Sequence, residues 1–465
     1  MAAVWSLSRF PDRFEVEAWD RMPQAGGVAT SEPIASDAKA SHDAGNASTF
    51  INDGVQAAAP TYRNALLMMD EFGFSGSPFH ITISFGRGDH HWANYRSSPL
   101  VRRLQPEIAR FGRALRWINR LEPLFVFVPI RLVLRALGFS ADFRNRLVFP
   151  LVAVFFGTGN QTPNVSAAII ARVFLDDDLR LFEYDPDTLL SQKPLMYAFP
   201  SLGQVYRTMQ QKLESTSATT DQQPRRAVKF RNNCTVREVR RLADRVVVTD
   251  SEGHSAEFDE IIFACDAEQA LKMIAEPTRM ERFALGNVEF FNDVTVTHSD
   301  LDYMHKHYEL NLGPDGDQYF TRTDESDPEK IEMSFNLCQY QPQLAGRDRQ
   351  QGNIFQTIFL DDNCSAMWTI DAIDPAKVLL RKWWRQFAHT WRHYAFTVPW
   401  MRFVQGRHRS WFCGSYTLVN THEIAVISGL AAAHRVGATY PFFDRDPLAA
   451  KQFRTYMGLS HGVAV

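Results

Sequence analysis

An acidic residue and two glycines near the start of the chain have the spacing of one half of a nucleotide-binding motif. Residues 14–20 alternate apolar and polar side chains as a strand does and end on Asp20, after which Gly26 and Gly27 follow. In a dinucleotide-binding unit the acid at the end of the second strand bonds a ribose hydroxyl, and glycines let the backbone approach the pyrophosphate. The pattern therefore predicts that Asp20, Gly26 and Gly27 contact a dinucleotide.

The strand and turn that come first in such a unit do not precede this segment. Val4, Leu7 and Phe10 have near-helical spacing, and Pro11 breaks that helix ahead of the strand. No G-x-G-x-x-G motif lies upstream. We therefore expect the sequence to begin inside the first helix of the unit, with about fifteen to twenty residues of strand and Gly-rich turn absent. We also expect the pyrophosphate site to lack one wall and to bind poorly.

The composition is that of a globular protein large enough for two domains. Of the 465 residues, 45% are hydrophobic and 12% are aromatic, which is enough for a large core. Fifty basic side chains against 53 acidic ones give a net charge of −3, and this balance argues against nucleic-acid binding. The five cysteines form no C-x-x-C pair, and no signal peptide opens the sequence, so we expect a reducing, cytoplasmic setting.

The middle of the chain predicts β structure, one insertion and one linker. Residues 36–48 are rich in Ala, Ser, Asp and Gly and predict a surface insertion, and residues 214–224 predict a polar linker. Residues 80–85 alternate as a strand. Residues 234–239, 246–249 and 258–264 predict a three-stranded meander whose last strand is apolar enough to be a buried parallel strand.

Residues 101–150 are both apolar and basic, with ten arginines against three acids. Apolar side chains at 104, 108, 111, 115 and 118 follow one helical face, and most of the arginines lie off that face. One interpretation is a cap-domain helix with a solvated arginine face; the alternative is peripheral contact of residues 101–135 with an anionic membrane. The apolar stretches at 121–134 and 147–156 are too short to span a bilayer and predict core or the walls of an apolar pocket.

The C-terminal block adds a second set of matching features. A strand-like segment at 410–413, a Gly414–Ser415 turn and a helix of small residues at 424–433 follow one another. With the Asp20 segment, this block resembles the FAD-dependent amine oxidase and phytoene desaturase superfamily, in particular its NAD(P)/FAD-binding oxidoreductase branch. The resemblance covers nearly the whole chain. It implies an α/β fold in which a Rossmann-type FAD-binding domain, without its first strand and Gly-rich turn, is interleaved with an α+β substrate or cap domain.

The same resemblance divides the chain and assigns its contacts to FAD. It implies an FAD-binding domain built from residues 1–75, 199–290 and 405–465, and a substrate domain built from residues 76–198 and 291–404. It assigns cofactor contacts to Asp20, Gly26, Gly27, Asn52, Asp53, Gly54, Val236, Ala264, Gly414, Ser415, Ser428 and Gly429. The start of the last helix is expected to point its N–H groups at the flavin pyrimidine oxygens, where a reduced flavin carries negative charge.

His422 and Glu423 are the candidates for catalytic groups, because the resemblance puts the segment before the last helix beside the flavin ring. A histidine there can move a proton while the flavin takes hydride. The alternative is that both residues cap the helix and anchor its loop. Amine oxidases commonly place a lysine near the flavin, and the sequence does not assign one.

Three other polar groupings in the sequence predict no site. The adjacent His90 and His91 point to opposite faces of an extended chain, so we expect no metal site. Ser415 lacks the G-x-S-x-G elbow that a hydrolase pair with His422 requires. His298 ends an alternating strand, where we expect a surface position rather than a substrate contact.

Three functions follow from these features. The first is an FAD-dependent oxidoreductase that takes hydride from a lipophilic small molecule, in line with 35 phenylalanines and the apolar stretches. The second is an FAD-dependent isomerase that moves a double bond in a fatty acid or polyene. The third is a non-catalytic or cofactor-poor relative, which the absent Gly-rich turn suggests. The sequence says nothing about oligomeric state.

Overall fold

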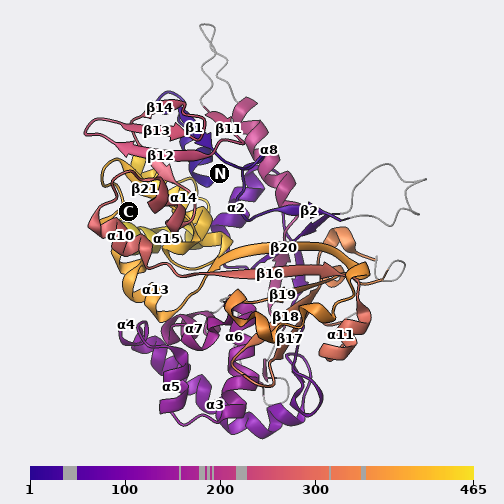
Figure 1. The fold of residues 1–465 in the computed structure, drawn as a ribbon. Coiled ribbons are helices and arrows are strands. Elements are labelled where there is room, and N and C mark those ends of the chain that lie inside the picture. Colours follow the sequence, from indigo (N-terminus) through magenta and orange to yellow (C-terminus); the bar gives the residue numbers. More distant parts are fainter. Residues whose placement is uncertain are drawn as a thin grey trace, which may run out of the picture.

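The computed structural model describes residues 1–34, 50–156, 159–176, 184–185, 189–190, 193–215, 228–313, 316–346 and 352–465. The predicted insertion at 36–48 lies outside the described residues, as does nearly all of the predicted linker at 214–224. The chain forms three regions, with a strand-rich end, a large central sheet and a helical end (Figure 1).

Two separate parallel strand pairs form the region that carries the predicted nucleotide site. Strand β1 (Val16–Trp19) pairs with β11 (Val228–Arg231), and β15 (Ile261–Phe263) pairs with β21 (Ser410–Phe412). Among the described residues, no strand pairs with the second edge of β1 or of β15. Every residue of β1 is half-buried, whereas parallel strands are usually buried on both faces. The expected absence of a first strand stays a prediction.

Two helices span the two strand pairs. Helix α1 (Ala2–Ser8) lies against α14 (His422–Val436), and Val16 of β1 and Ile262 of β15 pack against the apolar cluster that these helices share. The contact is close at Gly429, where a Cβ atom would lie 3.1 Å from the Ala2 Cβ. A side chain there would be in tight contact with α1, so glycine favours the close approach of the two helices.

A three-stranded meander is present where predicted, but its third strand is residues 255–258 and not 258–264. Strands β12 (Val236–Arg241), β13 (Val246–Asp250) and β14 (Ser255–Phe258) pair antiparallel. The prediction of one strand over 258–264 is wrong, because the chain changes sheets between Phe258, which pairs with β13, and Ile261, which pairs with β21. A continuous apolar run does not reveal such a change of partner.

A seven-stranded sheet crosses the middle of the molecule (Figure 1). Its strands, in spatial order, are β20 (Val378–Phe387), β16 (Phe290–His298), β19 (Phe355–Phe359), β18 (Ile331–Asn336), β17 (Tyr319–Thr323), β6 (Ile83–Phe85) and β7 (Trp92–Ala93). All neighbours pair antiparallel except β17 and β6. The single strand predicted at 80–85 is wrong, since β5 (Ser77–His80) leaves this sheet to join β10 (Leu195–Ala198) and β4 (Ala57–Ala58).

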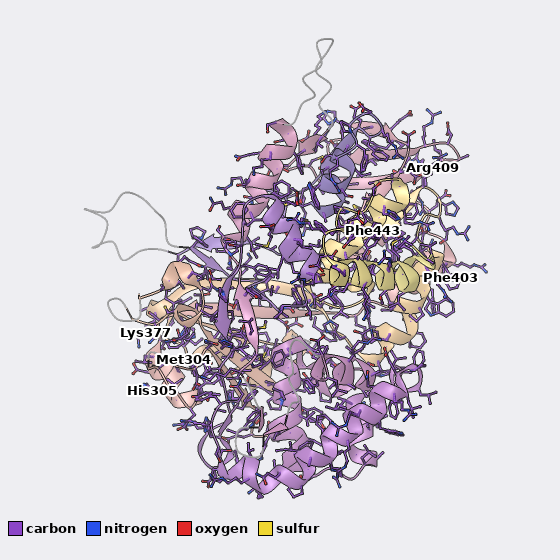
Figure 2. The ribbon with its side chains drawn as sticks, turned by 180° about the vertical axis from the view of Figure 1, so that it is seen from behind. Met304, His305, Lys377, Phe403, Arg409 and Phe443 are labelled. Carbon is purple, nitrogen blue, oxygen red and sulfur yellow. The ribbon has the colours of Figure 1, made fainter. Side chains whose placement is uncertain are left out.

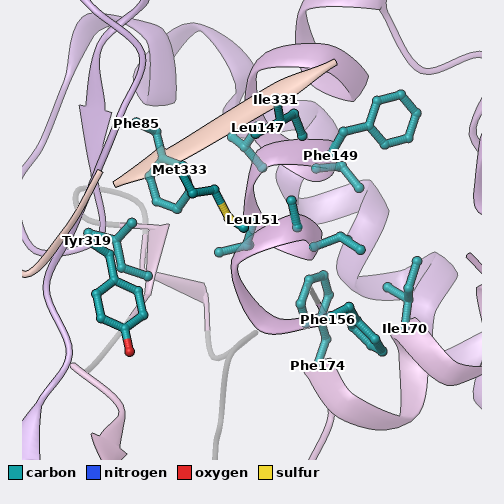
Figure 3. Close-up of a cluster of buried hydrophobic side chains, with 14 of the residues drawn as sticks. Phe85, Leu147, Phe149, Leu151, Phe156, Ile170, Phe174, Tyr319, Ile331 and Met333 are labelled. Carbon is teal, nitrogen blue, oxygen red and sulfur yellow. The ribbon is translucent and has the colours of Figure 1, made fainter. Parts of the chain in front are cut away.

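Helices cover the far side of this sheet (Figure 1). They include α3 (Pro99–Arg120), α4 (Glu122–Phe125), α5 (Ile130–Ala136), α6 (Phe149–Phe156) and α7 (Ala167–Phe174). The segment at 147–156 belongs to the core, where Phe149 and Leu151 are buried in one cluster with Ile331 and Met333 of β18 (Figure 3). The apolar stripe of α3 is buried in the same cluster, so it does not face a membrane. Among the described residues, no helix has the length and apolar character needed to cross a bilayer.

The remaining elements connect these regions. They are β2 (Ser31–Pro33), β3 (Phe50–Asn52), α2 (Arg63–Glu71), β8 (Tyr184–Asp185), β9 (Leu189–Leu190), α8 (Leu202–Ser215), α9 (Ala267–Met273), α10 (Arg279–Gly286), α11 (Leu301–His307), α13 (Trp391–Phe396) and α15 (Pro447–Tyr456). All five cysteines are free thiols.

Candidate cofactor site

Several predicted cofactor residues gather around the first turn of α1. The Gly414 N–H donates to Ser428 Oγ at 2.8 Å, and the neighbouring Gly429 touches Ala2. The Met1 amine is enclosed in the same place, where burial lowers its pKa and the negative charge of Asp20 opposes that shift. Residues from the two ends of the sequence therefore meet at one point, between the two parallel strand pairs.

Asp20 is fixed by backbone bonds and keeps one carboxylate oxygen available. Its Oδ1 accepts the Met22 N–H at 2.9 Å, and its backbone carbonyl accepts the Cys234 N–H at 2.8 Å. Among the described residues, none donates to Oδ2, and the side chain is half-buried. A hydroxyl of a ribose is a suitable donor for such an oxygen.

The Gly26–Gly27 pair has the backbone conformation that its prediction requires. Both residues have positive φ, 142° and 62°, which other residues adopt at a cost. A Cβ atom on Gly26 would lie 3.1 Å from the ring of Tyr206. The Tyr206 hydroxyl in turn lies 2.8 Å from His422 Nε2, so the glycine pair is one side chain away from the start of α14.

The N-terminus of α14 offers two free donors. Thr421 Oγ1 accepts the Ile424 N–H at 3.1 Å and so caps the helix. The N–H groups of His422 and Glu423 have no acceptor among the described residues. Unpaired N–H groups at the positive end of a 15-residue helix favour a negatively charged or electron-rich ligand group.

His422 is half-buried, and its imidazole is neutral. Besides its bond to Tyr206, its ring lies 5.5 Å from that of Phe199. Burial lowers its pKa to about 4, so the ring carries no charge at pH 7. A neutral ring bonded to a phenol can accept or pass on a proton.

Glu423 holds the first turn of α2. Its carboxylate accepts the N–H of Asn64 at 2.9 Å, the side-chain amide of Asn64 at 2.8 Å and the N–H of Ala65 at 2.8 Å. Burial raises its pKa to about 7 in spite of these bonds. The contacts fit the anchoring interpretation, and a catalytic role for Glu423 stays a prediction.

The Asn52–Gly54 segment is fastened to the large sheet. The Gln341 side chain accepts the Asn52 N–H at 3.0 Å and donates to the Asn52 carbonyl at 2.9 Å. A Cβ atom on Gly54 would lie 2.6 Å from the Val28 carbonyl and 2.7 Å from the Trp384 ring. Only a glycine can lie this close to both groups. The predicted flavin turn therefore packs directly against the large sheet, to which Trp384 belongs.

Asp53 forms an ion pair that the sequence did not predict. It is buried, and its Oδ2 lies 3.1 Å from Lys382 Nζ on β20, while its Oδ1 accepts from Thr30 Oγ1 at 2.9 Å. Burial raises the pKa of Asp53, and the Lys382 charge only partly opposes this shift. Lys382 also pairs with Glu32 at 2.6 Å. Lys382 is more than 300 residues away from Asp53 in the sequence, and no local pattern predicts that the two side chains meet.

The other predicted contacts lie at the edges of this region. Val236 begins β12 next to Cys234, which bonds Asp20, and Ala264 is exposed directly after β15. Ser415 Oγ donates to Asn420 Oδ1 at 3.2 Å, and His422 bonds Tyr206, so Ser415 and His422 form no hydrolase pair. In the part of the chain that the structure describes, no group of His, Cys, Asp and Glu can hold a metal ion.

The surface position expected for His298 is wrong. The residue is buried, with Nε2 3.0 Å from Thr357 Oγ1 and Nδ1 accepting the Asp300 N–H. Asp300 pairs with Lys377 at 2.9 Å, close to α11 at the side of the sheet where Figure 2 labels Lys377 and Met304. Helix α11 follows the strand and packs over His298, with the Tyr303 ring 5.3 Å away. The alternating pattern of the strand alone does not predict that a later helix buries its last residue.

Comparison with known proteins gives matches among solved structures. No protein-family model and no curated protein matches the sequence. The chain matches a CLA-producing fatty acid isomerase from P. acnes with a TM-score of 0.60 and 14% identity, covering 92% of this chain and 94% of the isomerase. It matches a triple mutant of putrescine oxidase with a TM-score of 0.61 and 11% identity, covering 94% and 95%.

A third match is cyclohexylamine oxidase from Brevibacterium oxydans IH-35A, with a TM-score of 0.59, 12% identity and coverage of 94% and 96%. The chain has the fold of these enzymes. Two of the three are amine oxidases by name, so the expected resemblance is confirmed at the level of a mixed α/β oxidase fold.

The pH dependence of stability should report the burial of Glu423. Its folded pKa of about 7 exceeds its ordinary value of 4.5, so its contribution to stability is fully present below pH 4.5 and is lost as the pH rises through 7. The free energy of unfolding of the wild type minus that of Glu423→Gln is expected to fall by about 3 kcal/mol across this window. Urea unfolding at a series of pH values measures the difference.

Glu325→Gln is the matched control, because Glu325 is exposed and its difference from the wild type should stay flat. A flat difference for Glu423→Gln as well would contradict the buried, proton-binding carboxyl.

Proposed function

We propose that the protein is an FAD-dependent oxidoreductase that accepts hydride from a lipophilic small molecule. The observation that carries the proposal is the order of the candidate contacts in space. The Asp20 charge acts on the Met1 amine at the start of α1, Gly414 bonds Ser428 of α14, and the free N–H groups of Glu423 and His422 lie five and six residues before Ser428, about 7.5 to 9 Å along the helix axis. An extended dinucleotide presents ribose, pyrophosphate and ring in the same order.

The chemistry of these groups suits each part of FAD. The free Asp20 oxygen suits a ribose hydroxyl, and the α14 N-terminus suits the electron-rich oxygens of a reduced ring. Gly414, whose N–H is bonded to Ser428, has no side chain and so allows a pyrophosphate to approach. When bound, FAD supplies a ring that accepts hydride. The fold shared with two amine oxidases and a fatty acid isomerase supports the same cofactor class.

The residues around His422 indicate what this chain contributes to the reaction. Its neutral ring can take up a proton, and the Tyr206 hydroxyl, 2.8 Å from Nε2, can orient the ring or donate its own proton to that nitrogen. The aromatic rings of Phe199 and Tyr206 line one part of the histidine, with centroids 5.5 Å and 6.1 Å from that of its ring. This lining, and the apolar substrate named for the isomerase, support a lipophilic substrate.

A second candidate is an isomerase that shifts a double bond in a fatty acid or polyene, with hydride leaving one carbon and returning to another. The match to a fatty acid isomerase over 92% of the chain favours this candidate. The two reactions need the same FAD site and differ in whether the electrons leave the protein. A non-catalytic relative would bind no FAD.

FAD affinity should depend on Asp20. Asp20→Ala is expected to weaken FAD binding by about tenfold to a hundredfold, because it removes a charge-assisted hydrogen bond to the ribose. Asp12→Ala is the matched control, since Asp12 is an exposed acid in the preceding turn. Titration of FAD, followed by flavin absorbance, measures both. Wild-type protein that is folded and takes up no FAD would overturn the proposal in favour of a non-catalytic relative.

Anaerobic addition of linoleic acid, and separately of a primary amine, distinguishes the two reactions. Lasting bleaching of the flavin indicates an oxidoreductase, and conjugated diene absorbance without lasting bleaching indicates an isomerase. With the substrate that responds, His422→Gln should slow the reaction by about a hundredfold or more and leave FAD binding unchanged. An unchanged rate would show that His422 only anchors its loop.

A further inference from the structure

The helical end of the molecule exposes a group of large apolar side chains. Leu124 is 66% exposed, Leu132 51%, Trp117 48% and Phe127 47%, and all four lie between the end of α3 and the start of α5. The Trp117 ring packs edge-on against Phe125 of α4 with 4.7 Å between centroids, so α3 and α4 form one continuous surface there. Exposed apolar groups in one place mark a contact surface.

Arginines surround these apolar side chains. Arg113, Arg116, Trp117 and Arg120 occupy one exposed face of α3 at helical spacing, opposite the buried stripe of the same helix. We call this face, together with Leu124, Phe127, Arg131 and Leu132, the Trp117 surface.

The charges of the Trp117 surface are not neutralised by ion pairs within the described part of the chain. Arg113, Arg116, Arg120 and Arg131 form no ion pair with a described residue. The acids nearby pair with other arginines: Glu107 with Arg110, Glu122 with Arg172, Asp142 with Arg103, and Glu329 with Arg135. The surface therefore combines exposed apolar side chains with cationic ones, in a chain whose net charge is −3.

The geometry points to an anionic membrane as the partner of the Trp117 surface. Isolated large side chains that project from a helical end can enter the boundary between head groups and acyl chains, where tryptophan is favoured. Arginines beside them bind anionic head groups, and each contributes about 1 kcal/mol, or about fivefold in binding. The helices that carry the surface lie at the end of the molecule opposite the meander (Figure 1).

Binding to vesicles tests this proposal without reference to FAD. The full chain should sediment with vesicles of phosphatidylcholine containing 30% phosphatidylglycerol, and should bind those of pure phosphatidylcholine at least tenfold more weakly. Leu124→Asp with Phe127→Asp should reduce binding to the anionic vesicles at least tenfold. Leu448→Asp, at a leucine on α15 that is 52% exposed, should leave it unchanged.

A second pair of variants tests the contribution of the arginines to vesicle binding. Arg116→Gln should weaken binding to the anionic vesicles about fivefold, and Arg237→Gln, at an exposed arginine on the meander, should have no effect. Binding of the wild type should also weaken as salt rises.

Three results would overturn the proposal. The first is absence of vesicle binding by the folded wild type. The second is equal binding of the wild type and the Leu124→Asp, Phe127→Asp variant. The third is a dimer, seen by light scattering, that this double variant dissociates while vesicles bind neither protein, since the surface would then be an interface between copies of the chain.

Discussion

The close packing of α1 on α14 is the contact on which the arrangement of the candidate site depends. The two parallel strand pairs are not hydrogen-bonded to each other in the described residues, and the helix pair holds them together through Val16 and Ile262. The same contact brings the first turn of α1 to Gly429 and to Ser428, which holds Gly414. A site assembled from both ends of the sequence thus rests on one glycine that allows two helices to approach.

Buried polar groups fix the rest of the site at a cost in desolvation. Glu423 holds α2, Gln341 holds Asn52, and Lys382 lies against Asp53, each across hundreds of positions in sequence. Burial raises the pKa of both acids, which shows that their partners do not fully replace water. Such bonds define position more than they add stability, because a buried ionised group gains little net free energy from its partner.

The sequence predicted the features that depend on local pattern. The helix before Pro11, the Asp20 strand, the meander and the last helix have local signals, and the structure contains each of them. The changes of sheet after His80 and Phe258, the cover over His298 and the Lys382 ion pair depend on residues far away in the chain. The buried stripe of α3 matched the cap-helix interpretation, yet the exposed side chains on α4 and α5 have no periodicity that would have revealed them.

Calorimetric titration of FAD into Gly429→Val and into the wild type tests whether the FAD site depends on the contact between α1 and α14. The added side chain would meet Ala2 and Ala3 and move α1 away from α14. We therefore expect FAD affinity to fall at least tenfold, while the circular dichroism spectrum of the variant stays unchanged. Equal FAD affinity in the two proteins would contradict a site built on the α1–α14 contact.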